Sequence, residues 1–319
     1  MAGLVMKTEY PRIDILGLGV VAVDDLIFVP SYPPADAKMP ISRRERHCGG
    51  LTATALVAAA RLGCHCSYAG VLGSDELSKF AIERLSQEGI NFSHLVRRDE
   101  ARPISATIIV DEGEKTRNIF FDLHGYVGAD DILPEADVIR SARVLFVDYL
   151  SPKGMLRAAR IAREAGIPIV ADFEGSDSPY FEELLGQVDH LIVSRGFATA
   201  FTGKKDPAEA ALRLWTPKRK VVVTTCGADG CWYVSDSRPE SPIHHPAFPV
   251  KVVDTTGCGD VFHGAYAAGL VLGMSLSERV RAASAAAALK AVRAGGQEGI
   301  PNLATVQAFL KGECSHESQ

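Results

Sequence analysis

Short apolar segments alternate with helical segments along most of this 319-residue chain, and this alternation is the strongest constraint on its fold. Apolar segments that each end in a polar residue lie at 144–148, 169–172 and 191–194. Helical patterns separate or follow them at 157–165, 178–185 and 208–214. Strands joined through helices pair in parallel, because each right-handed crossover returns the chain to the same end of the sheet. The alternation therefore predicts an α/β fold with a doubly wound, mainly parallel sheet flanked by helices.

Other segments extend this pattern toward both ends of the chain. Strands are predicted at 13–23, 66–71, 221–225, 231–234 and 248–253, and helices at 51–63, 76–88, 261–274 and 284–296. Residues 105–121 alternate apolar and polar side chains around Gly113, which is typical of a β-hairpin. Hydrophobic residues make up 47% of the chain, enough to form a large core. We therefore expect one α/β domain across residues 1–319.

The overall charge and the cysteines argue against several classes of protein. A net charge of −5 disfavours nucleic acid or an anionic membrane as a partner. The longest apolar run, near 15–23, is too short to span a bilayer, and no basic-then-apolar leader is evident. The seven cysteines have no regular spacing, and Cys64 and Cys66 lack a second pair at a zinc-site spacing. We predict reduced thiols in a cytoplasmic protein.

A glycine-rich turn at 254–260 separates the predicted strand 248–253 from the predicted helix 261–274. Gly257 and Gly259 let the backbone approach a ligand, and the unpaired N–H groups of a helix start favour an anion. Asp260 would lie in the first turn of that helix, where a carboxylate can accept a proton from a hydroxyl beside the anion. This combination is what phosphoryl transfer requires. The alternative is a glycine-rich turn in which Asp260 only stabilises the helix start.

Asp24 and Asp25 interrupt the apolar run directly after the first predicted strand. A carboxylate at the carboxyl end of a first strand lies where open α/β sheets bind ligands, and a turn aspartate is the alternative. The nearby Gly17-x-Gly19-x-x-Ala22 partly matches a dinucleotide-binding fingerprint. That fingerprint requires a helix directly after the glycines, whereas residues 20–29 stay apolar and β-branched. A dehydrogenase is therefore a weaker hypothesis, which a nicotinamide-binding titration would test.

The stretch Asp254-Thr-Thr-Gly-Cys-Gly-Asp260 resembles the D-T-T-G-A-G-D signature of the ribokinase-like (PfkB) carbohydrate kinases, with Cys258 where alanine is usual. Further motifs follow in the family's order along nearly the whole chain. The resemblance implies a ribokinase-like fold with a small β-sheet lid, formed by segments near 26–48 and 101–123. It also implies ATP-dependent phosphorylation of the hydroxymethyl group of a small sugar, with Mg²⁺ as cofactor. Within the family, the motifs are most similar to sulfofructose kinase and to fructokinase- and ketohexokinase-like members, which favours a ketohexose or a related sugar.

The resemblance also implies roles for individual residues. Asp260 would be the catalytic base, and the backbone N–H groups of Gly257, Cys258 and Gly259 would stabilise the transferred phosphoryl group. The sugar would contact residues near the lid: Asp24, which lies five residues after Gly19, and also Lys38, Gly49, Gly50 and Thr54. ATP would contact Ser194, Thr225, Gly227, Gly230 and Ser284, and a monovalent cation such as K⁺ would bind Asp254 and Thr256. Independently of the resemblance, segments 38–48 and 105–121 would leave exposed sheet edges on a monomer, so we predict that two lids pair in a homodimer.

Some positions depart from the family pattern. The N-x-x-E motif, which in the family organises metal and phosphates, would fall at 194–197 and is absent. Thr54 and Leu51 stand where members carry sugar-binding asparagines. Lys38 can equally be a solvated lysine of the lid. These departures keep two alternatives open: a nucleoside kinase, and a degenerate homologue that binds sugar without catalysis.

Overall fold

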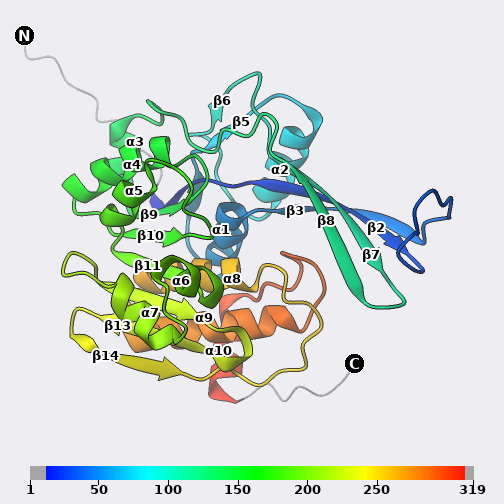
Figure 1. The fold of residues 1–319 in the computed structure, drawn as a ribbon. Coiled ribbons are helices and arrows are strands. Elements are labelled where there is room, and N and C mark those ends of the chain that lie inside the picture. Colours follow the sequence, from blue (N-terminus) through cyan, green and yellow to red (C-terminus); the bar gives the residue numbers. More distant parts are fainter. Residues whose placement is uncertain (1–11, 313–319) are drawn as a thin grey trace, which may run out of the picture.

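The computed structural model describes residues 12–312, and its core is an eight-stranded sheet (Figure 1). The strand order is β14-β13-β12-β11-β10-β9-β1-β4. From β12 to β4 every neighbouring pair is parallel, and β13 and β14 add an antiparallel edge. The predicted mainly parallel sheet is confirmed. Its strands are β1 Ile13–Leu18, β4 Cys66–Tyr68, β9 Ala142–Asp148, β10 Ile169–Asp172, β11 His190–Ser194, β12 Val221–Thr225, β13 Cys231–Ser235 and β14 Arg238–His245.

Helices cover both faces of this sheet. Successive side chains of a strand point to opposite sides, so each buried strand contributes apolar side chains to both layers of the core. Ile15 belongs to the core that contains α1, α8 and α9, whereas its neighbour Leu16 belongs to the core that contains α4, α5 and α7. The bounds of these helices are α1 Leu51–Arg61, α4 Pro152–Glu164, α5 Phe181–Gln187, α7 Pro207–Leu214, α8 Cys258–Val271 and α9 Leu276–Ala291. The other helices are α2 Glu76–Gln87, α3 Ala136–Ser141, α6 Arg195–Thr202 and α10 Leu303–Lys311.

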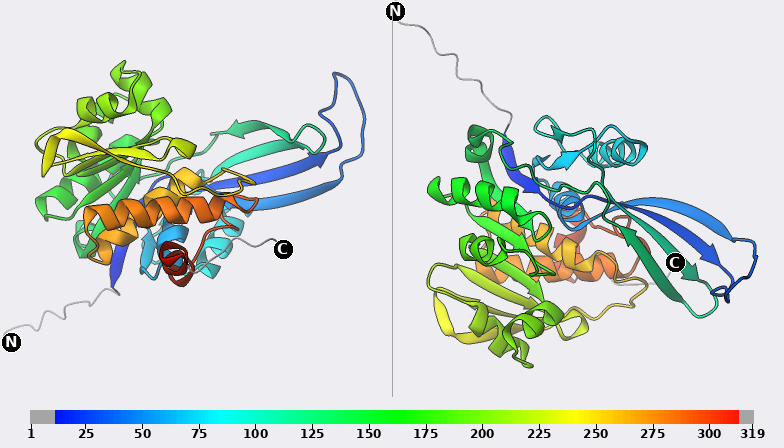
Figure 2. Two further views of the ribbon diagram at one scale, coloured as in Figure 1. Left: turned by 90° about the horizontal axis from the view of Figure 1, so that it is seen from below. Right: turned by 45° about the horizontal axis from the view of Figure 1, so that its top comes forward.

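A second sheet of four strands, called here the small sheet, extends away from the main body (Figure 2). Its order is β3-β2-β7-β8, with β2 Ala22–Val29, β3 Arg43–Gly49, β7 Ile104–Asp111 and β8 Thr116–Asp122. The predicted hairpin at 105–121 is confirmed, since β7 and β8 pair in antiparallel fashion. A separate two-stranded pairing joins β5 Val71–Leu72 to β6 Val96–Arg97.

The chain passes from the large sheet to the small sheet between Leu18 and Ala22, so the prediction of one strand over 13–23 is wrong. Gly19 makes this transition with φ at 150°, a backbone angle that residues with a Cβ rarely adopt. A Cβ at Gly19 would also collide with the carboxylate of Asp148 and the hydroxyl of Thr52. The glycine thus lets two strands of different sheets follow each other directly. The predicted strand 66–71 is likewise divided, into β4 and β5.

The predicted strand at 248–253 is also wrong, because this segment has no regular secondary structure. Pro249 lacks the N–H that a sheet ladder requires. The alternating apolar residues Phe248, Val250 and Val252 instead line a cavity. The antiparallel partners of β13 are β12 and β14, and both precede this segment in the chain.

Within residues 12–312, no helix combines the length and the apolar character needed to span a bilayer. The cysteines of this range are all free thiols, and Cys314 lies outside the described residues. No group of three or more His, Cys, Asp or Glu side chains in the described part of the chain is arranged to hold a metal ion, and this includes the surroundings of Cys64 and Cys66.

Candidate active site

The turn at 254–257 leads directly into α8, and its geometry depends on Gly257. This residue has φ at 76°, and a Cβ there would lie 2.6 Å from the carbonyl oxygen of Gly296. Because α8 begins at Cys258, Gly259 and Asp260 are in its first turn, where backbone N–H groups have no partner within the helix. The N–H of Cys258 donates to the Thr255 carbonyl (3.1 Å), so a phosphoryl group would have to replace that bond to use it.

Asp260 is half-buried at the start of α8. Burial raises the pKa of its carboxyl well above the usual range, and the nearby Asp172 and Glu174 raise it further. A carboxylate whose affinity for protons is increased in this way is a suitable general base near neutral pH. The position and the pKa of Asp260 are therefore both compatible with the predicted role.

One helical turn after Asp260, His263 is buried among oxygen atoms. Its Nδ1 lies 2.7 Å from the carbonyl of Gly259 and 3.3 Å from Asp172 Oδ2. Its Nε2 lies 2.9 Å from the carbonyl of Ile192, and burial lowers the pKa of the ring. His263 thus connects the first turn of α8 to the end of β10 and the middle of β11. Sequence reasoning did not single out this residue, because its partners are distant in the chain.

Asp24 lies on β2 in the small sheet, where burial raises the pKa of its carboxyl to about 6 and His47 opposes that shift. The strand register pairs Asp24 with His47, so both side chains lie on the same face of the small sheet. Asp25 lies on the other face, where Arg46 binds its carboxylate at 2.7 and 2.9 Å. Arg46 also reaches Glu76 of α2 at 2.8 Å. The two aspartates therefore have different neighbours, as expected from successive side chains of a strand pointing to opposite faces.

The face of the small sheet that carries Asp24 and His47 is called here its inner face. The register of β2, β7 and β8 places Arg117 on it as well. Two of these side chains contact loops next to α8: His47 Nδ1 lies 2.5 Å from Glu298 Oε1, and Arg117 Nη1 lies 3.2 Å from Asp254 Oδ1. The inner face therefore covers the 254–257 turn and the 295–300 loop.

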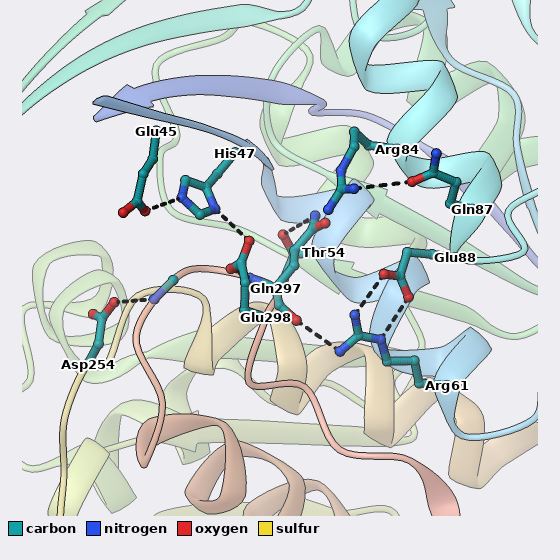
Figure 3. A network of polar contacts seen from close by, with 11 residues as sticks. Glu45, His47, Thr54, Arg61, Arg84, Gln87, Glu88, Asp254, Gln297 and Glu298 are labelled. Carbon is teal, nitrogen blue, oxygen red and sulfur yellow. Dashed lines mark hydrogen bonds and ion pairs between the residues drawn. The ribbon is translucent and has the colours of Figure 1, made fainter. Parts of the chain in front are cut away.

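The 295–300 loop connects several parts of the site (Figure 3). Gly295 N donates to Asp254 Oδ2 (3.0 Å), and Gln297 Nε2 donates to the hydroxyl of Thr54 (3.2 Å). Arg61 of α1 donates to the carbonyls of Gln297 (3.0 Å) and Ile300 (2.8 Å). The loop thereby fixes the 254–257 turn relative to α1.

His47 joins the small sheet to this loop through Glu298. Besides Glu298, its ring contacts Glu45, with 2.9 Å between Nε2 and Oε2 (Figure 3). Glu298 is the main cause that raises the pKa of His47, to about 9. The ring is therefore an imidazolium at neutral pH, held between two anions.

The structure places the other residues predicted to bind sugar as follows. Gly49 lies against Asp24, since a Cβ at Gly49 would be 2.9 Å from Asp24 Oδ2. Gly50 precedes α1 with φ at 99°, where a Cβ would meet the backbone of Val20 and Ala22. Thr54 is buried, and its hydroxyl is already bonded to Gln297. Lys38 is exposed on the loop between β2 and β3.

A cavity of about 390 Å³ opens at the start of α8. Four of the five residues predicted to bind ATP line it, namely Thr225, Gly227, Gly230 and Ser284. Ser194 is not part of the lining, and its hydroxyl instead caps α6 by accepting the Phe197 N–H (3.1 Å). The lining also includes Ala287 and Ala288 of the helix predicted at 284–296. Phe262 was missed by sequence reasoning, and Phe248, Val250 and Val252 were misread as a strand. Apolar walls suit a nucleobase, and Gly259 at one end suits phosphates.

Residues 18–303 match the sequence profile of the pfkB family carbohydrate kinases. The chain belongs to this family. The kinase is 32% identical to mouse ribokinase over 269 residues, which cover 79% of this chain and 81% of that one. It is 30% identical to fructokinase-1 of rice (Oryza sativa), with coverage of 82% and 87%. The solved structure of Arabidopsis thaliana ribokinase with ribose and ATP superposes on this kinase with a TM-score of 0.84 and 22% sequence identity. The superposition covers 94% of this chain and 99% of that one.

The family establishes the reaction class and confirms two predictions. The kinase is a phosphotransferase that acts on carbohydrates, and its fold is the ribokinase fold. Solved structures of this fold include complexes with ATP and with ATP and Mg²⁺. The roles of individual residues stay predictions, and the geometry above shows which of them lie together.

The residues predicted to bind a monovalent cation have cationic side chains as neighbours. Lys290 Nζ lies 2.9 Å from the carbonyl oxygen of Asp254. Arg117 contacts both Asp254 Oδ1 and the hydroxyl oxygen of Thr256. Sequence reasoning missed Lys290 and Arg117, because their contacts with the turn span 36 and 137 residues of chain.

Proposed function

We propose that this kinase transfers the γ-phosphoryl group of ATP to the hydroxymethyl group of a small neutral sugar, with a ketohexose as the first candidate. The observation that supports this most directly is the start of α8. Gly259 lines the cavity that suits a nucleotide, and the next residue is Asp260, whose pKa is raised by burial and by neighbouring carboxylates. A proton acceptor thus lies directly beside the place where phosphates would bind.

In the proposed mechanism, Asp260 accepts the proton of the sugar hydroxyl while that oxygen attacks the γ-phosphorus. The bond from this phosphorus to the bridging oxygen breaks, and ADP leaves. Phosphoryl transfer makes few covalent demands on a protein, so positioning and charge stabilisation dominate. First-turn N–H groups of α8, including that of Gly259, stabilise the phosphoryl oxygens. Asp24 accepts hydrogen bonds from other sugar hydroxyls. The small sheet acts as a lid, because its inner face already contacts the loops around α8.

Mg²⁺ would neutralise the charge of the ATP phosphates. This ion commonly keeps several waters and uses only one or two carboxylates besides phosphate oxygens, so the lack of a larger ligand cluster in residues 12–312 is compatible with it. Glu174 is exposed and close enough to Asp260 to raise its pKa. We propose that Glu174 would help to hold Mg²⁺ beside the phosphates.

The charges near Asp24 favour a neutral acceptor. The cation that acts on Asp24 is the His47 imidazolium, which is already bonded to Glu298 and Glu45. A phosphate or sulfonate on the sugar would therefore meet more negative than positive charge there. Similarity to rice fructokinase-1 supports a ketohexose, and similarity to mouse ribokinase makes ribose the second candidate.

An acceptor screen tests this proposal. ADP release would be measured with ATP, Mg²⁺ and a panel of ketohexoses, aldopentoses, sugar phosphates, sulfosugars and nucleosides, and phosphorus NMR would locate the new phosphate. The proposal expects the highest kcat/KM with a neutral sugar and the phosphate on its hydroxymethyl oxygen. A higher kcat/KM with a nucleoside or a sulfosugar would contradict it. ATP turnover that no sugar stimulates would instead support a non-catalytic homologue.

A further inference from the structure

Lys290 lies near the end of α9, and its side chain is completely buried at 0% exposure. Its ammonium Nζ is 2.9 Å from the carbonyl oxygen of Asp254, the first residue of the 254–257 turn. We propose that this ammonium is the built-in cation of the turn and replaces the monovalent cation that the family resemblance implies at Asp254 and Thr256. The kinase would then need no K⁺.

The oxygens that a monovalent cation would need are already bonded within the chain. Asp254 Oδ1 accepts hydrogen bonds from the N–H (2.9 Å) and the hydroxyl (2.7 Å) of Thr256. Asp254 Oδ2 accepts one from Gly295 N (3.0 Å), and Arg117 lies against the same carboxylate at 3.2 Å. A K⁺ ion among these groups would be repelled by both Lys290 and Arg117. These residues therefore do not fit a bound monovalent cation.

The surroundings of Lys290 are suited to a buried ammonium. A buried charge is tolerated when it is paired and hydrogen-bonded. Burial lowers the pKa of Lys290, whereas the negative charges of Asp254 and Glu298 favour its charged form and Arg117 opposes it. Lys290 would thus provide the positive charge as part of the chain. This charge has a fixed position and does not depend on the salt concentration.

The contacts around Lys290 indicate what its charge does for the reaction. Val253 N and Asp254 N both donate to the carbonyl of Ala291, at 2.8 and 3.1 Å, so the turn is attached to α9 at the residue after Lys290. On its other side, Gly257 packs against Gly296. Lys290 therefore holds the start of α8 in place between α9 and the 295–300 loop. It is a positioning residue for the proposed kinase site and does not touch the reacting atoms.

Thermal unfolding tests this inference without any turnover. Wild type and Lys290→Ala would be unfolded at constant ionic strength while tetramethylammonium chloride is replaced by KCl or NH₄Cl. The wild-type midpoint should not change. The variant should unfold at a lower temperature and be restabilised by K⁺ or NH₄⁺, which can enter the vacated space.

Lys220→Ala is the matched control, because the ammonium of Lys220 binds Asp236 at the surface (2.9 Å). Specific stabilisation of wild type by K⁺, or a Lys290→Ala midpoint equal to wild type, would overturn the inference.

Kinetics give a second readout. Wild-type turnover should be equal in K⁺ and in tetramethylammonium, and Lys290→Met should lose about tenfold to a hundredfold in kcat with little change in KM, the scale of a misplaced reacting group. Wild-type turnover that depends on K⁺ would overturn the inference. If no sugar is phosphorylated, the proposed function fails and the unfolding data still decide the role of Lys290. If Lys290→Ala does not fold, the wild-type titration alone decides.

Discussion

Asp260 experiences two opposing influences. The positive end of the α8 dipole favours its ionised form, whereas burial and the charges of Asp172 and Glu174 favour the protonated form. The second influence is the larger one, so the carboxyl holds its proton at a higher pH than an ordinary aspartate does. With Asp260 as the proposed base, we expect the reaction to be sensitive to pH.

We expect kcat/KM to fall as the pH is lowered, because only the ionised carboxylate accepts a proton. The acid limb should lie clearly above the usual aspartate pKa of about 4. Asp24, whose pKa is raised to about 6, should contribute to the same limb, since its proposed role is to accept hydrogen bonds from sugar hydroxyls in its ionised form. A pH–rate profile for ADP release measures this. Full activity down to a pH of about 4.5 would show that neither group titrates as described.

The neighbouring aspartates Asp24 and Asp25 form a matched pair for mutation. Asp24→Ala should raise the KM for sugar by about tenfold to a hundredfold, because charge-assisted hydrogen bonds contribute roughly 1.5–3 kcal/mol each. Asp25→Ala removes an ion pair with Arg46 on the opposite face of β2 and should change the KM little. The KM for ATP should be nearly unchanged in both variants. A larger effect of Asp25 on the sugar would contradict the assignment of the inner face.

At the scale of elements, the start of α8 depends on two glycines for different reasons. Gly257→Ala should destabilise the protein by about 1–3 kcal/mol, because φ is 76° and the new Cβ would lie 2.6 Å from the Gly296 carbonyl oxygen. Gly259→Ala should change stability by no more than about 0.5 kcal/mol, since no atom lies within 4 Å of a Cβ there. Its methyl group would instead enter the cavity and raise the KM for ATP. Denaturant unfolding of both variants tests this contrast, and equal destabilisation would contradict it.

The sequence predicted the elements whose signals are local. Alternation of strands and helices is visible in short windows, so the parallel sheet and the turn before α8 were both expected. The strand at 248–253 was wrong because its apolar alternation arises from lining a cavity, a property that a local pattern cannot distinguish from pairing. The contacts of Thr54, Arg117 and Lys290 were not predictable either, since each joins residues that only the tertiary fold brings together.

At the scale of the whole molecule, the small sheet leaves an uncovered edge. All seven residues of β8 are exposed, and three of them are large and apolar: Ile119 (51%), Phe120 (55%) and Phe121 (66%). Soluble proteins usually cover such an edge. We predict that two copies pair through the small sheet, and that Phe121→Asp shifts the population toward monomers. Light scattering at micromolar concentration measures this, and a fully active wild-type monomer would contradict it.

The central claim is that Asp260 is the base of a sugar kinase, and Asp260→Asn tests it most directly. The substitution keeps the size of the side chain and removes the proton acceptor. With the best sugar from the screen, turnover should fall by about 10² or more, the scale of a lost acid–base group. ATP affinity and the unfolding midpoint should stay close to wild type, which separates a chemical defect from a folding defect. A folded variant that retains more than about half of the wild-type turnover would contradict the account.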